Sequence, residues 1–338
     1  MEIRENHSLK SLNTFGVDAQ ARYFVKLENL EDAIKLKRSG LLKDYPCFIL
    51  GGGSNVLFTD DYEGVIIQMA GKGIGQPGKI KDRMLVKAAA GENWHSLVEY
   101  CISHDLGGLE NLSLIPGNVG AAPIQNIGAY GVEQQDVFYE LTAFDLEKAK
   151  PKKFRKKDCN FAYRNSIFKK DHRNKYLILD VTYSLSLSHT YQLGYAALDK
   201  VIRERHRGEI NLKVISGIVS EIRNSKLPDP ELLGNAGSFF KNPVIQQEAF
   251  SKLRSAYPEV PAYKLEGQQF KIAAGWLIEQ LGWKGKRMGD AGVHENQALV
   301  IVNYGEATGR EIFEFSEAVR MDVKKHFDID LEREVILL

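Results

Sequence analysis

The residues from Asn111 to Val132 read NLSLIPGNVGAAPIQNIGAYGV, with no charged side chain, four glycines, two prolines, three asparagines and one glutamine. This stretch is about long enough to span a bilayer, but prolines, glycines and amides would break a helix and leave polar groups in hydrocarbon. A solvated loop of this length would normally carry charge. Glycine permits close approach of the backbone, and amide side chains pair with polar edges. We interpret the stretch as a cradle for a large neutral ligand.

A second glycine-rich loop, Gly51-Gly52-Gly53-Ser54-Asn55, follows the short apolar run CFIL. Three glycines let successive N–H groups point at one anion, and the Ser and Asn side chains add donors, which suits a diphosphate. Taken alone, this loop is explained equally well as a tight turn. Together the two loops suggest one extended ligand, charged at one end and with a flat polar ring at the other. FAD has that shape.

Two further side chains could take part in chemistry. Arg164 lies among aromatic residues, and its permanently charged guanidinium could grip a carboxylate through two hydrogen bonds. Gly237-Ser238 resembles a nucleophile elbow, but Phe240 stands where the second glycine belongs. We therefore interpret Ser238 as a proton donor or hydrogen-bonding group. The alternatives are a surface salt bridge for Arg164 and an ordinary turn position for Ser238.

Residues 73–79 match one nucleotide-binding motif and nearly match another, but neither motif fits its surroundings. The dinucleotide fingerprint needs a helix after its glycines, whereas 79–90 has the pattern of a strand. A P-loop needs Ser or Thr after its lysine, where this chain has Ile80. We expect a hairpin turn at 73–78.

Composition narrows the class of protein. The chain has 338 residues, enough for two or three domains, with near-average apolar and charged fractions and a formal net charge of +1. Charge therefore gives no global reason to expect binding to nucleic acid or to membranes. The basic cluster 148–157 is predicted to be an exposed connection, with a nucleic-acid patch as the alternative.

The chain also contains signals about its compartment. Three widely spaced cysteines, Cys47, Cys101 and Cys159, suggest free thiols in a reducing compartment. The N-terminal residues lack an apolar signal region, and no apolar run could serve as a membrane helix. We expect a cytoplasmic protein with no membrane insertion.

The elements that must position these residues follow from periodicity and caps. Strands are expected at 21–27, 47–50, 137–144, 175–187 and 298–303, and 65–69 and 84–90 look like paired strands around a turn at 71–83. Asn29 and Gly40 bound a helix over 30–39, Asn93 begins another, and Thr308 with Glu311 forms a capping box. Further helices are expected from about 209 and at 246–256 and 270–281, KLPDP at 226–230 reads as a domain junction, and LEREVILL as a returning strand.

Eight segments together resemble one known family. They are GGGSNVLF, IPGNVGAAPIQNIGAYG, FAYRNSIFK, KLPDP, NAGSFFKNP, AAGWLIEQ, AGVHENQALVIVN and LEREV, in this order across nearly the whole chain. The chain is similar to the UDP-N-acetylenolpyruvoylglucosamine reductase (MurB) family, in the subtype with a tyrosine-bearing substrate loop.

The resemblance implies an α+β fold. We expect an FAD-binding domain of the PCMH type, made of two α/β subdomains at 1–70 plus 328–338 and at 71–226. A smaller α+β substrate-binding domain is expected at 227–327. The FAD-binding domain would then be discontinuous, and the protein a monomer. FAD would be noncovalent, since neither glycine loop holds a histidine or cysteine.

The resemblance also implies a reaction of peptidoglycan precursor synthesis. NADPH reduces FAD, and the reduced flavin passes hydride to the vinyl carbon of an enolpyruvyl UDP-sugar. Arg164 then corresponds to the catalytic arginine, Ser238 to the proton donor and Glu334 to the third catalytic residue. A desolvated Glu334 could stay protonated and donate a hydrogen bond to the enolate. A solvated charge on an edge strand is the alternative, and Glu332 is a decoy two residues away.

The remaining site residues follow from the same resemblance. Those expected to bind substrate are Tyr195, Arg223, Lys226, Asn242, Tyr263, Lys271, Lys284 and Gln297. Those expected to bind FAD are Gly51, Gly52, Gly53, Ser54, Asn55, Ile115, Gly117, Gly120, Ala121, Ala122, Gln125, Asn126, Gly128, Tyr130 and Gly131. Ala121 and Ala122 stand where some relatives have serine, and Ile336 where many have a basic residue, so FAD contacts there would differ.

Two rival functions are open at this point. One is an oxidase of the same FAD-binding superfamily that acts on an alcohol or a sugar. The other is a flavin- or nucleotide-binding module without catalysis, which would need none of Arg164, Ser238 and Glu334.

Overall fold

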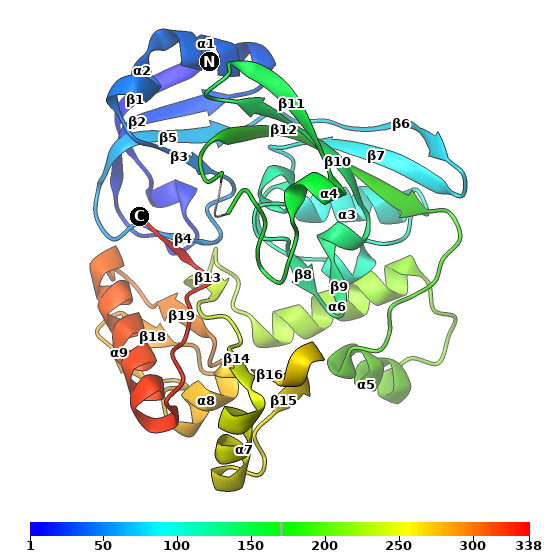
Figure 1. Ribbon diagram of the computed structural model, residues 1–338, viewed down its shortest axis with the longest axis vertical. Coiled ribbons are helices and arrows are strands. Elements are labelled where there is room, and N and C mark those ends of the chain that lie inside the picture. Colours follow the sequence, from blue (N-terminus) through cyan, green and yellow to red (C-terminus); the bar gives the residue numbers. More distant parts are fainter. Residues whose placement is uncertain (170–171) are drawn as a thin grey trace. The chain divides into compact units, whose positions relative to one another are not determined.

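The computed structural model, in which residues 1–169 and 172–338 are described, divides into two units (Figure 1). The first unit comprises Met1–His7, Ala21–Gly52 and Tyr62–Ser225, and the second comprises Ser8–Gln20, Gly53–Asp61 and Lys226–Leu338. Both units are therefore discontinuous in sequence. The finer division of the FAD-binding part at residue 70 stays a prediction.

The N-terminal sheet of the first unit contains β1 (Glu2–Ser8), β2 (Gln20–Leu27), β5 (Tyr62–Met69) and β3 (Cys47–Leu50), in that order. β5 runs parallel to both β2 and β3. Helix α1 (Leu30–Ser39) begins where the Asn29 side chain accepts from the N–H of Asp32 and ends at Gly40 in a left-handed conformation, as predicted. The short helix α2 (Leu41–Asp44) follows.

A five-stranded antiparallel sheet forms the rest of the core of the first unit. Its order is β11 (Lys150–Arg155), β10 (Phe138–Asp145), β12 (Tyr176–Ser186), β7 (Arg83–Ala89) and β6 (Ile74–Ile80). Helix α3 (Trp94–Ser103) packs its Trp94, Leu97 and Val98 against the same core as Val86 and Val181 of the sheet.

The prediction for residues 65–90 was wrong in two respects. β5 and β7 lie in different sheets, and the presumed turn at 71–83 contains strand β6, which pairs with β7 as a long hairpin (Figure 1). Residues 74–78 therefore form strand and not a hairpin turn, and the chain reverses near Lys81, whose φ is 55°. β6 carries two glycines and a proline, so its strand structure comes from pairing with β7 rather than from propensity.

The basic cluster 148–157 includes edge strand β11 and the start of α4 (Lys156–Cys159), and most of its residues are exposed. Lysines on an edge strand discourage pairing with another chain. The first unit also contains helix α5 (Ala196–Arg205), which was not predicted, and most of α6 (Leu212–Lys226).

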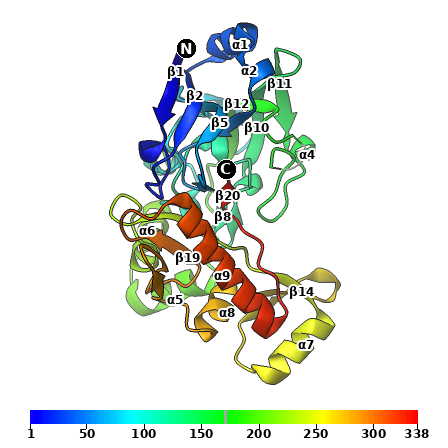
Figure 2. The same cartoon turned by 90° about the vertical axis from the view of Figure 1, so that its left-hand side faces the viewer.

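The main sheet of the second unit has the order β13 (Gly234–Ser238), β19 (Val300–Asn303), β18 (Ala291–Val293) and β17 (Arg287–Met288). Helix α9 (Gly309–Phe327) lies against it and buries Ile312, Phe315 and Val319 (Figure 2). The predicted capping box of Thr308 and Glu311 is present at the start of α9.

A smaller sheet, ordered β14 (Val244–Gln246), β16 (Gln269–Ile272) and β15 (Ala262–Lys264), is accompanied by α7 (Gln247–Ala256) and α8 (Ala274–Gln280). The helix predicted at 270–281 is therefore too long, because its first residues form the central strand of this sheet. The predicted terminal strand is confirmed as β20 (Ile336–Leu337), which runs parallel to β4 (Val56–Leu57).

All three cysteines are free thiols. Over residues 1–169 and 172–338, none of the helices combines the length and apolarity that crossing a bilayer requires. Within the same ranges, no group of three or more His, Cys, Asp or Glu side chains could hold a metal ion.

Candidate active site

Within the first unit, Gly51 and Gly52 of the first glycine-rich loop lie against the cradle. A Cβ added to Gly52 would stand 2.9 Å from the Cα of Gly117, and one added to Gly51 would stand 2.9 Å from the Cβ of Ala121. Glycine is therefore required at both positions by close backbone approach. The contact supports the interpretation that both loops serve one ligand.

Gly53, Ser54 and Asn55 belong to the second unit. Gly53 has φ +67°, and a Cβ there would stand 1.9 Å from the carbonyl oxygen of Leu12. A left-handed backbone and a steric conflict thus both require glycine at this position.

The turn that follows β7 holds the cradle by backbone hydrogen bonds. The N–H of Gly120 donates to the carbonyl of Ala90 at 2.9 Å, and that of Val119 donates to Glu92 at 2.9 Å. These bonds hold the short 3-10 helix Val119–Ala121 next to the residues that follow the end of β7. The cradle is therefore an ordered loop supported by β7 and α3.

The side chain of Asn126 fixes the C-terminal part of the cradle by hydrogen bonds. Its side chain is fully buried, and its Nδ2 donates to Glu133 Oε2 at 2.7 Å and to the carbonyl of Ala162 at 3.2 Å. Its Oδ1 accepts from Gln134 Nε2 and from the N–H of Gln135. Both polar atoms of the Asn126 side chain are therefore engaged within the protein. The FAD contact predicted at this residue would come from its backbone.

Arg164 lies on a two-residue turn, closed by reciprocal hydrogen bonds between Ala162 and Asn165. Its φ is +52°, a conformation in which a residue other than glycine costs about 1–3 kcal/mol and which clusters at functional sites. Its Nη2 donates to the carbonyl of Gly128 at 2.7 Å, and its guanidinium lies 5.3 Å from the centre of the Tyr163 ring. These contacts place the half-buried guanidinium beside the cradle.

Arg223, on α6, approaches the cradle from another direction. Its Nε donates to the carbonyl of Leu114 at 3.2 Å. Burial lowers the pKa of the Arg223 guanidinium; the nearby Tyr130 opposes this shift, and the positive charge of Arg164 adds to it. Two cations held near each other with incomplete hydration form a site that favours an anionic ligand.

Tyr130 and Tyr195 complete this group in the first unit. Tyr130 has φ +49°, and its ring meets that of Tyr195 edge to face with centroids 5.2 Å apart. Burial raises the pKa of the Tyr130 hydroxyl. Tyr195 precedes α5 and is 45% exposed, so it can contact a ligand.

Ser238 ends strand β13 of the second unit at a bulge. The register with β19 shifts between Asn235 and Ser238, and Gly237 has φ +66°. The Asn235 side chain accepts from the N–H of Gly237 at 2.9 Å, which stabilises this irregular backbone. Bulges often redirect a functional side chain at the end of a strand.

Glu334 lies opposite Phe239, the residue after Ser238, because the C-terminal segment runs antiparallel to residues 239–241. The N–H of Glu334 donates to the carbonyl of Phe239 at 2.8 Å, and its own carbonyl accepts from Asn55 Nδ2 at 3.2 Å. Glu332, by contrast, forms a surface ion pair with Lys241 and is 70% exposed. The second unit thus joins the backbone of Glu334 to Phe239 and to the side chain of Asn55.

The other predicted substrate residues of the second unit have varied surroundings. Tyr263 and Lys271 face each other on β15 and β16, with the lysine Nζ 5.8 Å from the ring centre. The Oδ1 of Asn242 accepts from the N–H of Ala274 at the start of α8. Lys284 forms an ion pair with Glu279 at 2.8 Å, Lys226 is exposed, and the Gln297 carbonyl accepts from Val300.

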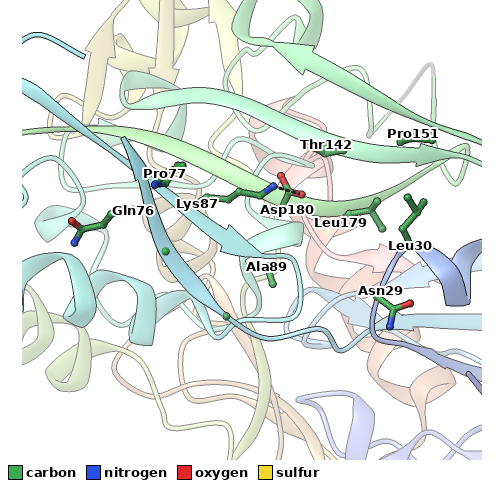
Figure 3. A pocket seen from close by; sticks show the side chains of 12 residues that line it. Asn29, Leu30, Gln76, Pro77, Lys87, Ala89, Thr142, Pro151, Leu179 and Asp180 are labelled. Atoms are coloured by element: carbon green, nitrogen blue, oxygen red, sulfur yellow. Dashed lines mark ion pairs between the residues drawn. The ribbon is translucent and has the colours of Figure 1, made fainter. Parts of the chain in front are cut away.

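A cavity of about 610 Å³ in the first unit lies apart from all of these residues (Figure 3). It opens on the five-stranded sheet, where Lys87 and Asp180 form an ion pair at 3.0 Å. Its other lining residues include Asn29 and Leu30 at the start of α1 and Pro77 of β6. No residue predicted for catalysis, substrate or FAD lines it.

Asn111 is a residue of the cradle that sequence reasoning did not single out. It is 1% exposed, and its Nδ2 donates to the carbonyls of Tyr130 at 2.9 Å and Gln192 at 2.8 Å. It thereby ties the cradle to the segment that leads to Tyr195. The amide-rich composition pointed to this stretch, but it could not separate amides that hold the loop from amides that face a ligand.

The geometry fits FAD on two observations from the structure itself. The glycines of the two loops permit close backbone contact, and a neutral cradle ends beside two guanidinium groups. The first suits a ring and diphosphate held by main chain, and the second suits an anionic substrate next to it.

Comparisons with known proteins agree with this fit. A family model described as "FAD binding domain" matches residues 21–149, and one described as "UDP-N-acetylenolpyruvoylglucosamine reductase, C-terminal domain" matches residues 229–338. The chain is 46% identical to a UDP-N-acetylenolpyruvoylglucosamine reductase of Amoebophilus asiaticus, over 100% of both chains. It is 45% identical to one of Flavobacterium johnsoniae, over 99% of both.

A solved structure also resembles the chain. The UDP-N-acetylenolpyruvylglucosamine reductase (MurB) from Thermus caldophilus aligns with a TM-score of 0.68, covering 99% of this chain and 98% of its own. At 24% sequence identity, this likeness concerns the fold.

Proposed function

The chain belongs to the UDP-N-acetylenolpyruvoylglucosamine reductase family, and on that premise we propose what it catalyses and which residues act. It reduces UDP-N-acetyl-3-O-(1-carboxyvinyl)-glucosamine to UDP-N-acetylmuramate, an FAD-dependent step of peptidoglycan precursor synthesis. The observation that carries this proposal is the identity of 46% with such a reductase across the whole chain. The two rival functions, an oxidase and a binding module, lack a comparable observation.

The cofactor is held by the two glycine-rich loops. Backbone groups of Gly51–Asn55 suit the diphosphate, and the cradle from Ile115 to Gly131 suits the flavin ring. When bound, FAD supplies hydride that originates from NADPH. The residues of the chain then have three tasks: they grip the substrate, stabilise negative charge and deliver one proton.

Arg164 carries the electrostatic task. Addition of hydride to the terminal vinyl carbon leaves an electron pair on the carbon next to the carboxylate. This pair is delocalised into the carboxylate, which a guanidinium can meet with two parallel hydrogen bonds. The bond from Arg164 Nη2 to the Gly128 carbonyl holds the guanidinium beside the cradle, where it can take this role.

Ser238 carries the protonation task. Its hydroxyl gives a proton to the carbon next to the carboxylate, so that hydride and proton together saturate the double bond. A serine hydroxyl is a weak acid and needs a strongly basic acceptor and good placement. Glu334, whose backbone is bonded to that of Phe239, donates a hydrogen bond to the enolate.

The UDP-sugar carries a diphosphate and a carboxylate, and the cations and aromatic rings of the site suit both. Arg223 and Tyr195 in the first unit, with Tyr263 and Lys271 in the second, are proposed to bind it. Lys226, Asn242, Lys284 and Gln297 are proposed as further contacts.

We propose in addition that the protein acts as a monomer in the cytoplasm and binds no nucleic acid. Three free cysteines suit a reducing compartment, and lysines on the β11 edge oppose strand pairing. The formal net charge of +1 offers little attraction for a polyanion. Light scattering of the purified protein tests the monomer.

An anaerobic experiment tests the function. Purified protein should show a flavin spectrum that NADPH bleaches and that the enolpyruvyl UDP-sugar restores. Ser238→Ala should leave bleaching fast and slow the restoration by about 10²-fold or more, whereas Ser251→Ala, on an exposed face of α7, should change neither. Recovery by oxygen alone with no response to the sugar would indicate an oxidase, and lack of bleaching would indicate a binding module.

A further inference from the structure

The first two residues of α3 hold the entrance of the cradle at three points. Trp94 Nε1 donates to the carbonyl of Leu112 at 2.9 Å, and the backbone N–H of Trp94 donates to the carbonyl of Gly117 at 3.0 Å. Between them, the N–H of Leu114 donates to His95 Nδ1 at 3.0 Å. Of the three bonds, only the one to His95 depends on an imidazole, which can accept at Nδ1 only while that nitrogen carries no proton.

The residue that His95 binds has an unfavourable backbone. Leu114 has φ +58°, which brings the Cβ of an L-residue too close to its following carbonyl. Such a conformation persists only where the surroundings fix it. The hydrogen bond to His95 is therefore a support that the turn needs.

The carbonyl of the same residue, Leu114, reaches the proposed substrate site. The carbonyl of Leu114 accepts from Arg223 Nε at 3.2 Å, and the following residues, Ile115 and Gly117, belong to the FAD cradle. A change in the orientation of Leu114 would therefore disturb both the guanidinium of Arg223 and the start of the cradle.

We propose that His95 is a positioning residue which, acting through Leu114, orients Arg223 for the anionic substrate. This inference rests on the proposed function. It requires neutral imidazole, with its proton on Nε2, because Nδ1 must present a lone pair to the N–H of Leu114. A doubly protonated ring would place its Nδ1–H against the N–H of Leu114, so the turn would lose this hydrogen bond.

Charged groups of α3 and α6 lie near His95 and Leu114 respectively. On α3, Glu99 Oε1 lies 3.7 Å from His95 Nε2, and its side chain is 67% exposed. On α6, Arg223 contacts the Leu114 carbonyl. The pH response of the wild-type protein is therefore compared with that of a variant that cannot titrate at this position.

Asparagine provides that comparison. In H95N the side-chain oxygen stands as many bonds from the backbone as Nδ1 does, so it can accept from Leu114 without titrating. H95F keeps a ring but has no acceptor. H104N is the matched control, because His104 caps the other end of α3 and its Nδ1 lies 2.8 Å from the Tyr100 carbonyl.

The test measures KM and kcat of the FAD-saturated enzyme for the enolpyruvyl UDP-sugar between pH 8 and pH 5.5. We expect the KM of the wild-type protein and of H104N to rise as pH falls, by roughly three- to tenfold more than that of H95N. At pH 8, H95N should match the wild type within about threefold, while H95F should show a KM raised at every pH.

Two results would overturn the proposal. One is an equal pH dependence of KM in the wild type and H95N; the other is an H95N variant as impaired as H95F at pH 8. Failure of the proposed function looks different, because the wild-type protein would then not turn over at all. In that case the affinity for FAD is measured by flavin fluorescence over the same pH range in the wild type, H95N and H95F. The pH dependence of this affinity then supports or overturns the role of His95 in the same way as KM would.

Discussion

At the scale of single residues, Arg164 offers the most direct test of the proposed chemistry. Its guanidinium is fixed by the Gly128 carbonyl at 2.7 Å and by the ring of Tyr163. Arg164→Lys retains the charge but loses the planar pair of donors. We expect flavin reduction by NADPH to stay within about twofold, and reoxidation by the enolpyruvyl sugar to slow by roughly 10²–10³-fold, as for the loss of one oxyanion donor.

Stopped-flow absorbance of the flavin measures both half-reactions. Arg155→Lys is a fitting control, since Arg155 is exposed at the end of β11 and stacks over Tyr139. Normal reoxidation in Arg164→Lys would show that a single positive charge is sufficient and would remove the bidentate role.

The two glutamates of the C-terminal segment form a natural pair for a second prediction. Glu334→Ala should slow reoxidation by about 10-fold or more, because it removes the hydrogen bond that we propose Glu334 donates to the enolate. Glu332→Ala should leave the rate within about twofold, because the ion pair of Glu332 with Lys241 is exposed on the glutamate side and such pairs contribute about 0–1 kcal/mol. Equal losses in the two variants would point to damage of the segment rather than to a role for Glu334.

Residue types alone indicated some positions better than others. The glycines at 51–53, the uncharged cradle and Arg164 could be selected from the sequence because their types are unusual in their surroundings. Asn111 and His95 could not. Their importance lies in the partners that the fold brings to them, such as the Gln192 carbonyl, and no spacing in the sequence encodes those partners.

At the scale of elements, the two glycine-bearing segments differ sharply in what they tolerate. Gly53→Ala would force a left-handed alanine against Leu12 O at 1.9 Å, whereas Gly75 has nothing within 4 Å of an added Cβ. We expect Gly53→Ala to cost roughly 3 kcal/mol or more. Gly75→Ala should be neutral within about 0.5 kcal/mol.

Urea unfolding followed by circular dichroism gives both free energies. An unchanged midpoint for Gly53→Ala would mean that the 10–13 segment moves freely away from the loop. The contrast matters because both segments match glycine motifs in the sequence, yet only the 51–55 loop has the constrained geometry that a ligand-holding turn requires.

Elements with local signals were predicted well. α1 has Asn29 and Gly40 as its caps and α9 has its capping box, and these depend on residues three or four positions apart. Strands β6 and β16 were missed for the opposite reason. β6 has little strand propensity, and β16 lies between β14 and β15, so both owe their structure to pairing across the sheet.

At the scale of the whole molecule, the two units share the chain in an interleaved way. The segments Ser8–Gln20 and Gly53–Asp61 belong to the second unit although most of it begins at Lys226. The returning terminal strand predicts a discontinuous domain, but no motif or spacing indicates that two short N-terminal segments enter the core of the second unit. The type and spacing of the apolar residues in these segments do not indicate which element they pack against.

This interleaving predicts that residues 226–338 do not fold alone, although a family model matches nearly the same range. Phe15, Val17 and Leu57 are at most 2% exposed and belong to the core of the second unit. Losing their burial removes roughly 5–9 kcal/mol at about 1.5–3 kcal/mol for each side chain. That equals much of the about 5–15 kcal/mol that stabilises a typical domain.

The isolated segment should therefore show no cooperative thermal transition by circular dichroism and poorly dispersed amide signals by NMR. The full chain should unfold in a cooperative transition and give well-dispersed amide signals. A sharp transition in the segment alone would mean that its remaining core is sufficient and that the N-terminal segments are dispensable.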